Sequence, residues 1–128
     1  TSVSGSSEVF GYGFVTYWEQ AKAKLVGVDP AVIEKYNVVS APVAAQMALG
    51  AAKASGADIA VSVTGVAGPT GGTPQTPVGT VFLGVSGPKG TRVEECHFTG
   101  DRAQVRAQSA AHALEMALEA LEQEKSPD

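Results

Sequence analysis

The residues of this chain best suited to chemistry gather in one loop, residues 64–80, with the sequence TGVAGPTGGTPQTPVGT. Of its 17 residues, 13 are Gly, Pro or Thr. Glycines leave backbone N–H groups open to an anion, prolines restrict the loop, and threonine hydroxyls add donors. The loop follows a predicted strand at 58–63, and ligands of open α/β sheets bind where strands end. We therefore predict that this loop holds a phosphorylated small molecule.

The loop matches neither of the familiar phosphate-binding motifs. It has no Gly-Lys-Ser/Thr, and its first glycines are spaced GxxGxxG instead of GxGxxG. The residues that open it could orient a substrate or stabilise an oxyanion through a hydroxyl and an N–H group. The candidate substrate contacts are Thr64, Gly65, Ala67, Gly68, Gly71, Gly72 and Thr73. The alternative is a long connector, stiffened by proline, that binds nothing.

Two further pairs of residues could take part in the same chemistry. Tyr17 ends a predicted strand, and Lys22 lies in the first turns of the following helix. The positive end of a helix dipole disfavours an ammonium group, which would lower the lysine pKa towards that of a general base. Arg102 and Arg106 lie one turn apart at the start of the last helix, where guanidinium and N–H groups suit a phosphate. The alternative is a solvated lysine and a half-buried tyrosine with structural roles only.

The elements that must position these residues follow from periodicity and capping signals. We predict strands at 8–17, 58–63, 80–86 and 91–98, and helices at 19–26, 30–37, 40–55 and 101–125. Asp29, Ser40 and Asp101 are the expected N-caps, and the strand at 58–63 is expected to be parallel and buried. The order predicts one α/β domain, a three-layer α/β/α sandwich around a mixed sheet.

Composition excludes several classes of protein. A net charge of −4 argues against a broad nucleic-acid surface, and no apolar stretch is long enough to span a membrane. The N-terminus lacks the pattern of a signal peptide, and the single cysteine, Cys96, suits a reducing compartment, so we expect a cytoplasmic protein. Cys96 and His97 are neighbours on a predicted strand and point to opposite faces, so we expect no metal site and no cofactor.

The sequence of the loop and the residue after it, TGVAGPTGGTPQTPVGTV at 64–81, resembles the signature of the CinA C-terminal domain family, the bacterial nicotinamide mononucleotide deamidases. Three more segments agree in order and spacing: GSSEVFGYGFVTY at 5–17, VVS at 38–40 and GDRAQVR at 100–106. The resemblance covers essentially the whole chain, residues 1–128. It implies an α/β/α fold, a homo-oligomer, and hydrolysis of nicotinamide mononucleotide to nicotinic acid mononucleotide and ammonia.

The resemblance also implies a serine nucleophile assisted by a tyrosine and a lysine, to which Tyr17 and Lys22 correspond. The family's serine belongs to a Glu-Ser-x-Thr-Gly-Gly motif, which is absent from these 128 residues. In the family it precedes the position of Thr1, so we expect a domain that is incomplete at its N-terminus. Trp18 and Glu19 stand where the family has a small residue and Asn, which bears on substrate identity.

Two other functions stay open at this stage. One is a non-catalytic nucleotide-binding module, in which the loop binds phosphate and no nucleophile is supplied. The other is an interaction domain of a larger competence- or damage-inducible protein. A Glu-Ser-x-Thr-Gly-Gly motif encoded just upstream would favour the enzyme over both.

Overall fold

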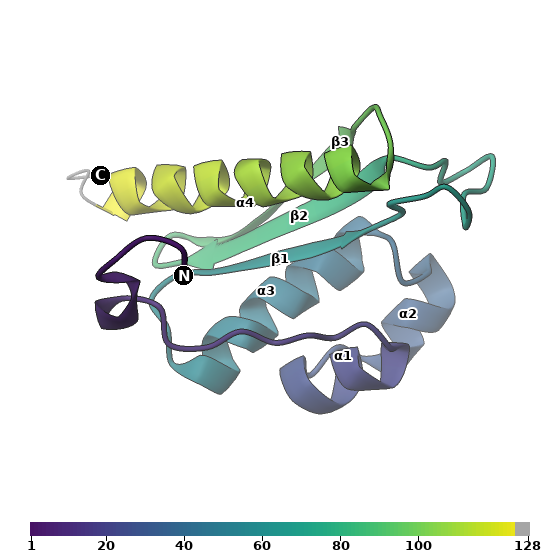
Figure 1. The fold of residues 1–128 in the computed structure, drawn as a ribbon. Helices are drawn as coiled ribbons and strands as arrows, with labels where there is room; N and C mark the ends of the chain where they lie inside the picture. The colour runs from purple at the N-terminus through teal and green to yellow at the C-terminus, as the bar shows by residue number, and fades with distance from the viewer. Residues whose placement is uncertain (125–128) are drawn as a thin grey trace.

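A computed structural model describes residues 1–124 as four α-helices and a three-stranded sheet (Figure 1). The elements are a 3-10 turn, η1 (Ser6–Glu8), then α1 (Glu19–Val26), α2 (Pro30–Tyr36), α3 (Ala41–Ser55), β1 (Ala60–Gly65), β2 (Thr80–Gly87), β3 (Gly90–His97) and α4 (Arg102–Glu124). The predicted helices and the hairpin are confirmed. The predicted end of the last helix, at Lys125, lies outside the described residues.

Local capping explains where the helices begin and end. The Asp29 carboxylate accepts a hydrogen bond from the N–H of Ala31 at 2.9 Å, and helix α2 starts there. Gly27 and Gly56 end α1 and α3 in the left-handed conformation that glycine adopts without strain. Ser40 occupies the N-cap position of α3, but its hydroxyl donates to the carbonyl of Asn37 and does not accept from the helix.

The sheet is antiparallel throughout the described residues, with the strand order β1-β2-β3. Val63 of β1 lies opposite Leu83 of β2, which in turn lies opposite Glu94 of β3. The expected parallel pairing of the 58–63 strand is therefore wrong, because β1 pairs with β2 antiparallel, and the described strands do not form the expected mixed sheet. The glycine-rich loop returns the chain to the neighbouring strand without a helical crossover, which produces antiparallel pairing.

Helices α3 and α4 lie on opposite faces of the sheet (Figure 1). The α4 face carries one hydrophobic core, in which Leu83 and Val81 of β2 pack against Val105 and Met116 of α4. On the α3 face, a Cβ on Gly84 would lie 2.6 Å from the carbonyl oxygen of Ala44, so only glycine permits this approach. A second core joins α1, α2 and α3, through Val26, Val28, Ile33, Val43 and Met47.

The strand predicted at 8–17 is absent. Residues 6–8 form η1, and residues 9–17 run from η1 to α1 without a strand ladder (Figure 1). Their β-branched and aromatic composition suits a strand, but a strand needs a neighbour to satisfy its N–H and C=O groups. Most of their large side chains are exposed, including Val15 at 86%. This segment is extended and has no partner strand among the described residues.

Candidate functional site

The predicted catalytic residues meet in a groove of about 1100 Å³ between residues 9–17 and strand β1. Tyr17 and Lys22 line it from the N-terminal segment and α1, and Thr64 and Gly65 line it from the end of β1. Apolar side chains form much of the rest, among them Val61, Val63, Met47 and Leu114. Residues distant in sequence are thus brought to one concave surface, where binding and catalysis are usually found.

Lys22 is the most unusual side chain of this groove. It is only 6% exposed, and its ammonium donates a hydrogen bond of 2.5 Å to the backbone carbonyl of Thr16. Burial lowers the pKa of Lys22 from its ordinary value of 10.5, while the negative charge of Glu19 opposes that shift. The predicted direction of the shift is confirmed, and its largest cause is loss of water. A lysine with a lowered pKa beside a groove can accept a proton from a nucleophile.

Tyr17 and Thr64 differ sharply in how firmly they are held. The Tyr17 ring is 81% exposed, whereas Thr64 is 6% exposed and donates a 3.0 Å hydrogen bond to the carbonyl of Val38. The Thr64 hydroxyl keeps its acceptor lone pairs for a donor in the groove. Thr64 also ties β1 to the Val38–Ser40 segment that precedes α3. The β1 wall of the groove is therefore held in place by a hydrogen bond, whereas the Tyr17 side chain is exposed to solvent.

The glycine-rich loop leaves the groove at Gly65 and is closed by its own hydrogen bonds. At its base, the N–H of Val66 donates to Thr80 O at 2.9 Å, and the N–H of Gly79 donates to Val66 O at 2.8 Å. Near its tip, Thr73 bonds Thr76 twice, through its N–H group and through its hydroxyl, which accepts from the Thr76 N–H. This pairing makes the Thr73 hydroxyl part of a turn.

The interior of the loop depends on glycine at two positions. A Cβ at Gly68, whose φ is +83°, would lie 2.5 Å from the side chain of Val78, and a Cβ at Gly72 would lie 2.7 Å from the Val78 N–H nitrogen. Val78 therefore sits between the two glycines and holds the two limbs of the loop together. Ala67 packs on the core beneath α4, and Gly71 adopts a φ of +93° in the exposed part. Sequence reasoning did not single out Val78, because nothing local distinguishes it.

The two arginines at the start of α4 have different surroundings. Arg102 donates from Nη1 to the carbonyl of Gly68 at 2.9 Å, across 34 residues of sequence. Arg106 is exposed, one turn further along the helix. Asp101 caps α4 as predicted, because its carboxylate accepts from the N–H of Gln104 at 2.9 Å and Gln104 returns a bond to the Asp101 N–H.

The predicted residues thus fall into two groups. Tyr17, Lys22, Thr64 and Gly65 line the groove, whereas Ala67, Gly68, Gly71, Gly72, Thr73, Arg102 and Arg106 belong to the loop and the start of α4 beyond it. The carbonyl of Thr16, which holds Lys22, was not predicted, since a backbone group leaves no signal in the sequence. No helix in the described part of the chain has the length and hydropathy needed to cross a membrane.

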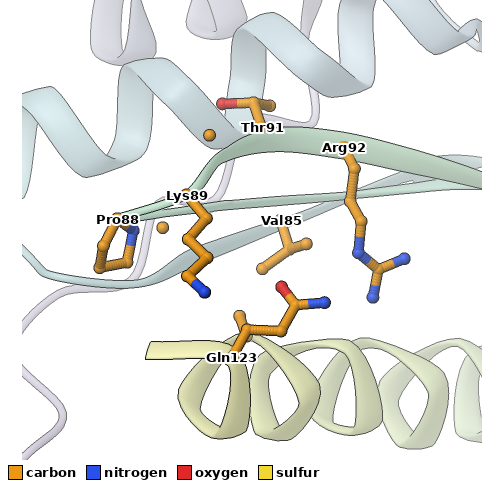
Figure 2. Close-up of a pocket in the computed structure, with 9 residues that line it drawn as sticks. Val85, Pro88, Lys89, Thr91, Arg92 and Gln123 are labelled. Atoms are coloured by element: carbon orange, nitrogen blue, oxygen red, sulfur yellow. The ribbon is translucent and has the colours of Figure 1, made fainter. Parts of the chain in front are cut away.

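A second, smaller cavity of about 80 Å³ lies at the β2–β3 turn (Figure 2). Lys89 and Arg92 line it together with Gln123 of α4. Arg92 forms ion pairs with Glu94 and with Glu119, the latter at 2.6 Å, so its charge is used in joining β3 to α4. The cavity contains none of the predicted site residues.

The chain is similar in sequence to a known protein family and to several of its members. Residues 1–121 match the CinA C-terminal domain family. The chain is 48% identical over 119 residues to the nicotinamide-nucleotide amidohydrolase PncC of Enterobacter agglomerans, covering 92% of this chain and 73% of that protein. It is 53% identical over 119 residues to a CinA-like protein of Chlorobaculum tepidum, covering 89% of this chain but only 28% of that longer protein.

A solved structure has the same fold. The competence/damage inducible protein CihA from Agrobacterium tumefaciens superposes with a TM-score of 0.90 at 38% sequence identity, over 92% of this chain and 73% of that one. The chain therefore spans about three quarters of the shorter relatives, and less than a third of the longer CinA-like relative.

Proposed function

Because this chain belongs to the CinA C-terminal domain family, we propose that its groove and loop form the substrate site of an amidohydrolase acting on nicotinamide mononucleotide. The observation that carries the proposal is the buried Lys22 at the groove, with a lowered pKa and one carbonyl partner. The relative PncC is named a nicotinamide-nucleotide amidohydrolase, and it is 48% identical to this chain. The products would be nicotinic acid mononucleotide and ammonia.

In the proposed reaction, a serine hydroxyl attacks the amide carbon and its proton passes to Lys22 in those molecules whose Lys22 amine has lost its proton, a fraction that a lowered pKa increases. The C–N bond then breaks, Lys22 returns the proton, and ammonia leaves. Water hydrolyses the resulting ester and regenerates the serine. Tyr17, at the groove's rim, is proposed to assist proton transfer, and Thr64 and Gly65 to orient the amide. These proposed steps use only the protein's side chains, the amide and water, and require no cofactor.

The nucleotide's phosphate is proposed to lie towards the glycine-rich loop and the start of α4. Gly68, Gly71 and Gly72 would offer it N–H groups, Thr73 would lie beside it in the turn that it forms with Thr76, and Ala67 holds the loop on the core. Arg102 and Arg106 would supply positive charge on the same side. The reacting amide and the phosphate would thus contact the two groups of residues described above.

The nucleophile is proposed to come from outside these 128 residues. Two serines line the groove, but Ser62 donates to the carbonyl of Ala44 and Ser55 to the carbonyl of Ala51, so both hydroxyls are engaged with α3. About a quarter of the PncC relative also lies outside the matched region. A segment from the longer chain would therefore bring the serine to Lys22.

The groove offers a place for such a segment. Its two walls are residues 9–17, which are extended and unpaired, and β1, which pairs with β2 on one side only. Val61 and Val63 of β1 are 37% and 42% exposed there. We propose that an additional strand lies between the two walls, pairs with both, and covers these valines.

Ammonia release from nicotinamide mononucleotide tests the proposal, with the longest encoded chain that contains these residues. Lys22→Ala should lower turnover by at least about a hundredfold, the scale of a lost general base. Lys24→Ala, an exposed lysine of the same helix, is the matched control and should stay within about twofold of the parent. Unchanged turnover in Lys22→Ala would refute the assigned role. Nucleotide binding without ammonia release would favour a non-catalytic binding module.

A further inference from the structure

Arg102 is the only one of the proposed phosphate-side residues whose charged group already has a protein partner within the described residues. Its guanidinium donates to the carbonyl of Gly68 at 2.9 Å, and Gly68 is buried. A bond from a charged donor is stronger than one between neutral groups. The two residues are 34 positions apart, so this bond fixes the loop to α4 and is not a local turn contact.

The backbone that carries Arg102 is itself held firmly. Asp101 and Gln104 bond each other reciprocally at 2.8 and 2.9 Å, and the side chain of Gln108 donates to Thr99 O at 2.8 Å. Val105, three residues after Arg102, is 2% exposed in the core between α4 and the sheet. The guanidinium therefore extends from a rigid base, as a residue that positions something else must do.

Gly68 is contacted both by α4 and by the loop's own residues. Its carbonyl meets Arg102, while Val78 fills the space against its Cα from within the loop. Three residues earlier, Gly65 lines the groove beside Lys22. The direction in which the loop leaves the groove, and hence where its N–H groups point, depends on where Gly68 is held.

We infer that Arg102 is a positioning residue, which holds Gly68 and thereby orders loop residues 66–79 for the nucleotide before it binds. The identity of the ligand in this inference rests on the proposed function, whereas the ordering of the loop by Arg102 does not depend on it. The loop would be pre-organised in the free protein, so binding would require less ordering. Arg106 does not make this bond, so it would add positive charge near the phosphate without ordering the loop.

Hydrogen exchange of the ligand-free chain tests the structural step. Arg102→Ala should raise exchange of the loop amides at 66–79 by about tenfold, because one charge-assisted bond is lost. The matched control for this measurement is Arg106→Ala, which removes the same charge from the same helix and should leave loop exchange within about twofold. Exchange in β2 and β3 should be unchanged in both, which separates local loosening from unfolding.

Kinetics of the longest encoded chain that contains these residues test the link to substrate. Arg102→Ala should raise KM for nicotinamide mononucleotide by about tenfold with kcat within about threefold, and Arg102→Lys, which keeps a donor, should recover part of the loss. Loop exchange that is unchanged in Arg102→Ala, or raised equally in Arg106→Ala, would overturn the inference. If the parent chain releases no ammonia, the proposed function fails, while the exchange experiment still decides the role of Arg102.

Discussion

The two sides of β2 differ in how completely they are packed. Towards β3 and α4, Leu83, Val85 and Met116 are each at most 3% exposed and form one continuous core. Towards β1 and residues 9–17, Val61 and Val63 are more than a third exposed, and Leu114 of α4, which lines the groove, is 69% exposed. We call these the packed half and the open half.

The difference shows how the proposed site is divided. The packed half holds the glycine-rich loop through Arg102 and Gly68, so it can present the phosphate side in the free protein. The open half holds Lys22 at a groove with apolar walls, where a further strand could bury the exposed valines. The proposed phosphate side therefore lies on the packed half, and the proposed catalytic side lies on the open half. Four substitutions can break or sharpen this contrast.

Leu83→Ala should have the largest effect on stability, because Leu83 is fully buried in the packed half. Removing its side chain leaves a cavity and should lower the free energy of unfolding by about 3 kcal/mol in urea denaturation. Leu114→Ala, in the open half, should change it by less than about 0.5 kcal/mol, because Leu114 is mostly exposed. Equal losses in the two variants would mean that the open half is packed in solution, and the contrast would fail.

Gly84→Ala should have the next largest effect. The new Cβ would lie 2.6 Å from both the carbonyl of Ala44 and the hydroxyl of Ser62, so β2 and α3 must separate. We expect a loss of about 2 kcal/mol, typical of overpacking. Gly11→Ala, in the open segment, meets nothing within 4 Å and serves as control. A tolerated Gly84→Ala, with an unchanged midpoint of thermal unfolding, would show that the α3–β2 contact is looser than described.

Lys22→Met should stabilise the chain at neutral pH by about 1 kcal/mol, because it removes a charge that is costly to bury. Burial lowers the folded-state pKa of Lys22 below 10.5, so between these two values the unfolded chain binds more protons than the folded chain. The parent's stability should then rise with pH across that window, and the advantage of Lys22→Met should shrink. Lys24→Met, which is exposed, should show neither effect. A pH-independent advantage would contradict the linkage.

Val63→Thr should have the smallest effect in the 128-residue chain. The side chain is 42% exposed, so exchanging a methyl for a hydroxyl should change stability by less than about 0.5 kcal/mol. In a longer chain with the proposed strand in the groove, the same hydroxyl would be buried and should cost about 1 kcal/mol or more. Urea denaturation of both chains measures the difference. The same small effect in both would argue against the strand.

Much of the secondary structure could be predicted because its causes are local. Asp29 and Asp101 cap helices through bonds to residues two or three positions away, and Gly27 ends a helix by its own conformation. The β2–β3 hairpin follows from the turn at 87–90. The strand at 8–17 and the parallel orientation of β1 were wrong, since a strand is defined by its neighbour and the neighbour is not encoded nearby.

The candidate site divides in the same way. The composition and sequence of the loop predict that it is a binding element, and the position of Lys22 in the first turns of α1 predicts a general base. The low pKa of Lys22, however, arises mainly from burial against Thr16 and the groove, a larger cause than any charge. The bond from Arg102 to Gly68 could not be predicted, because no spacing in the sequence relates residues 34 apart.

The sequence by itself determined the helices, the hairpin and the identity of the loop, because these depend on residue types and on contacts within a few positions. Only the tertiary structure decided that the loop is held by Arg102, that Lys22 loses its water, and that one half of the sheet stays open. Those outcomes depend on burial and on contacts between distant segments, which exist only once the helices and strands have packed.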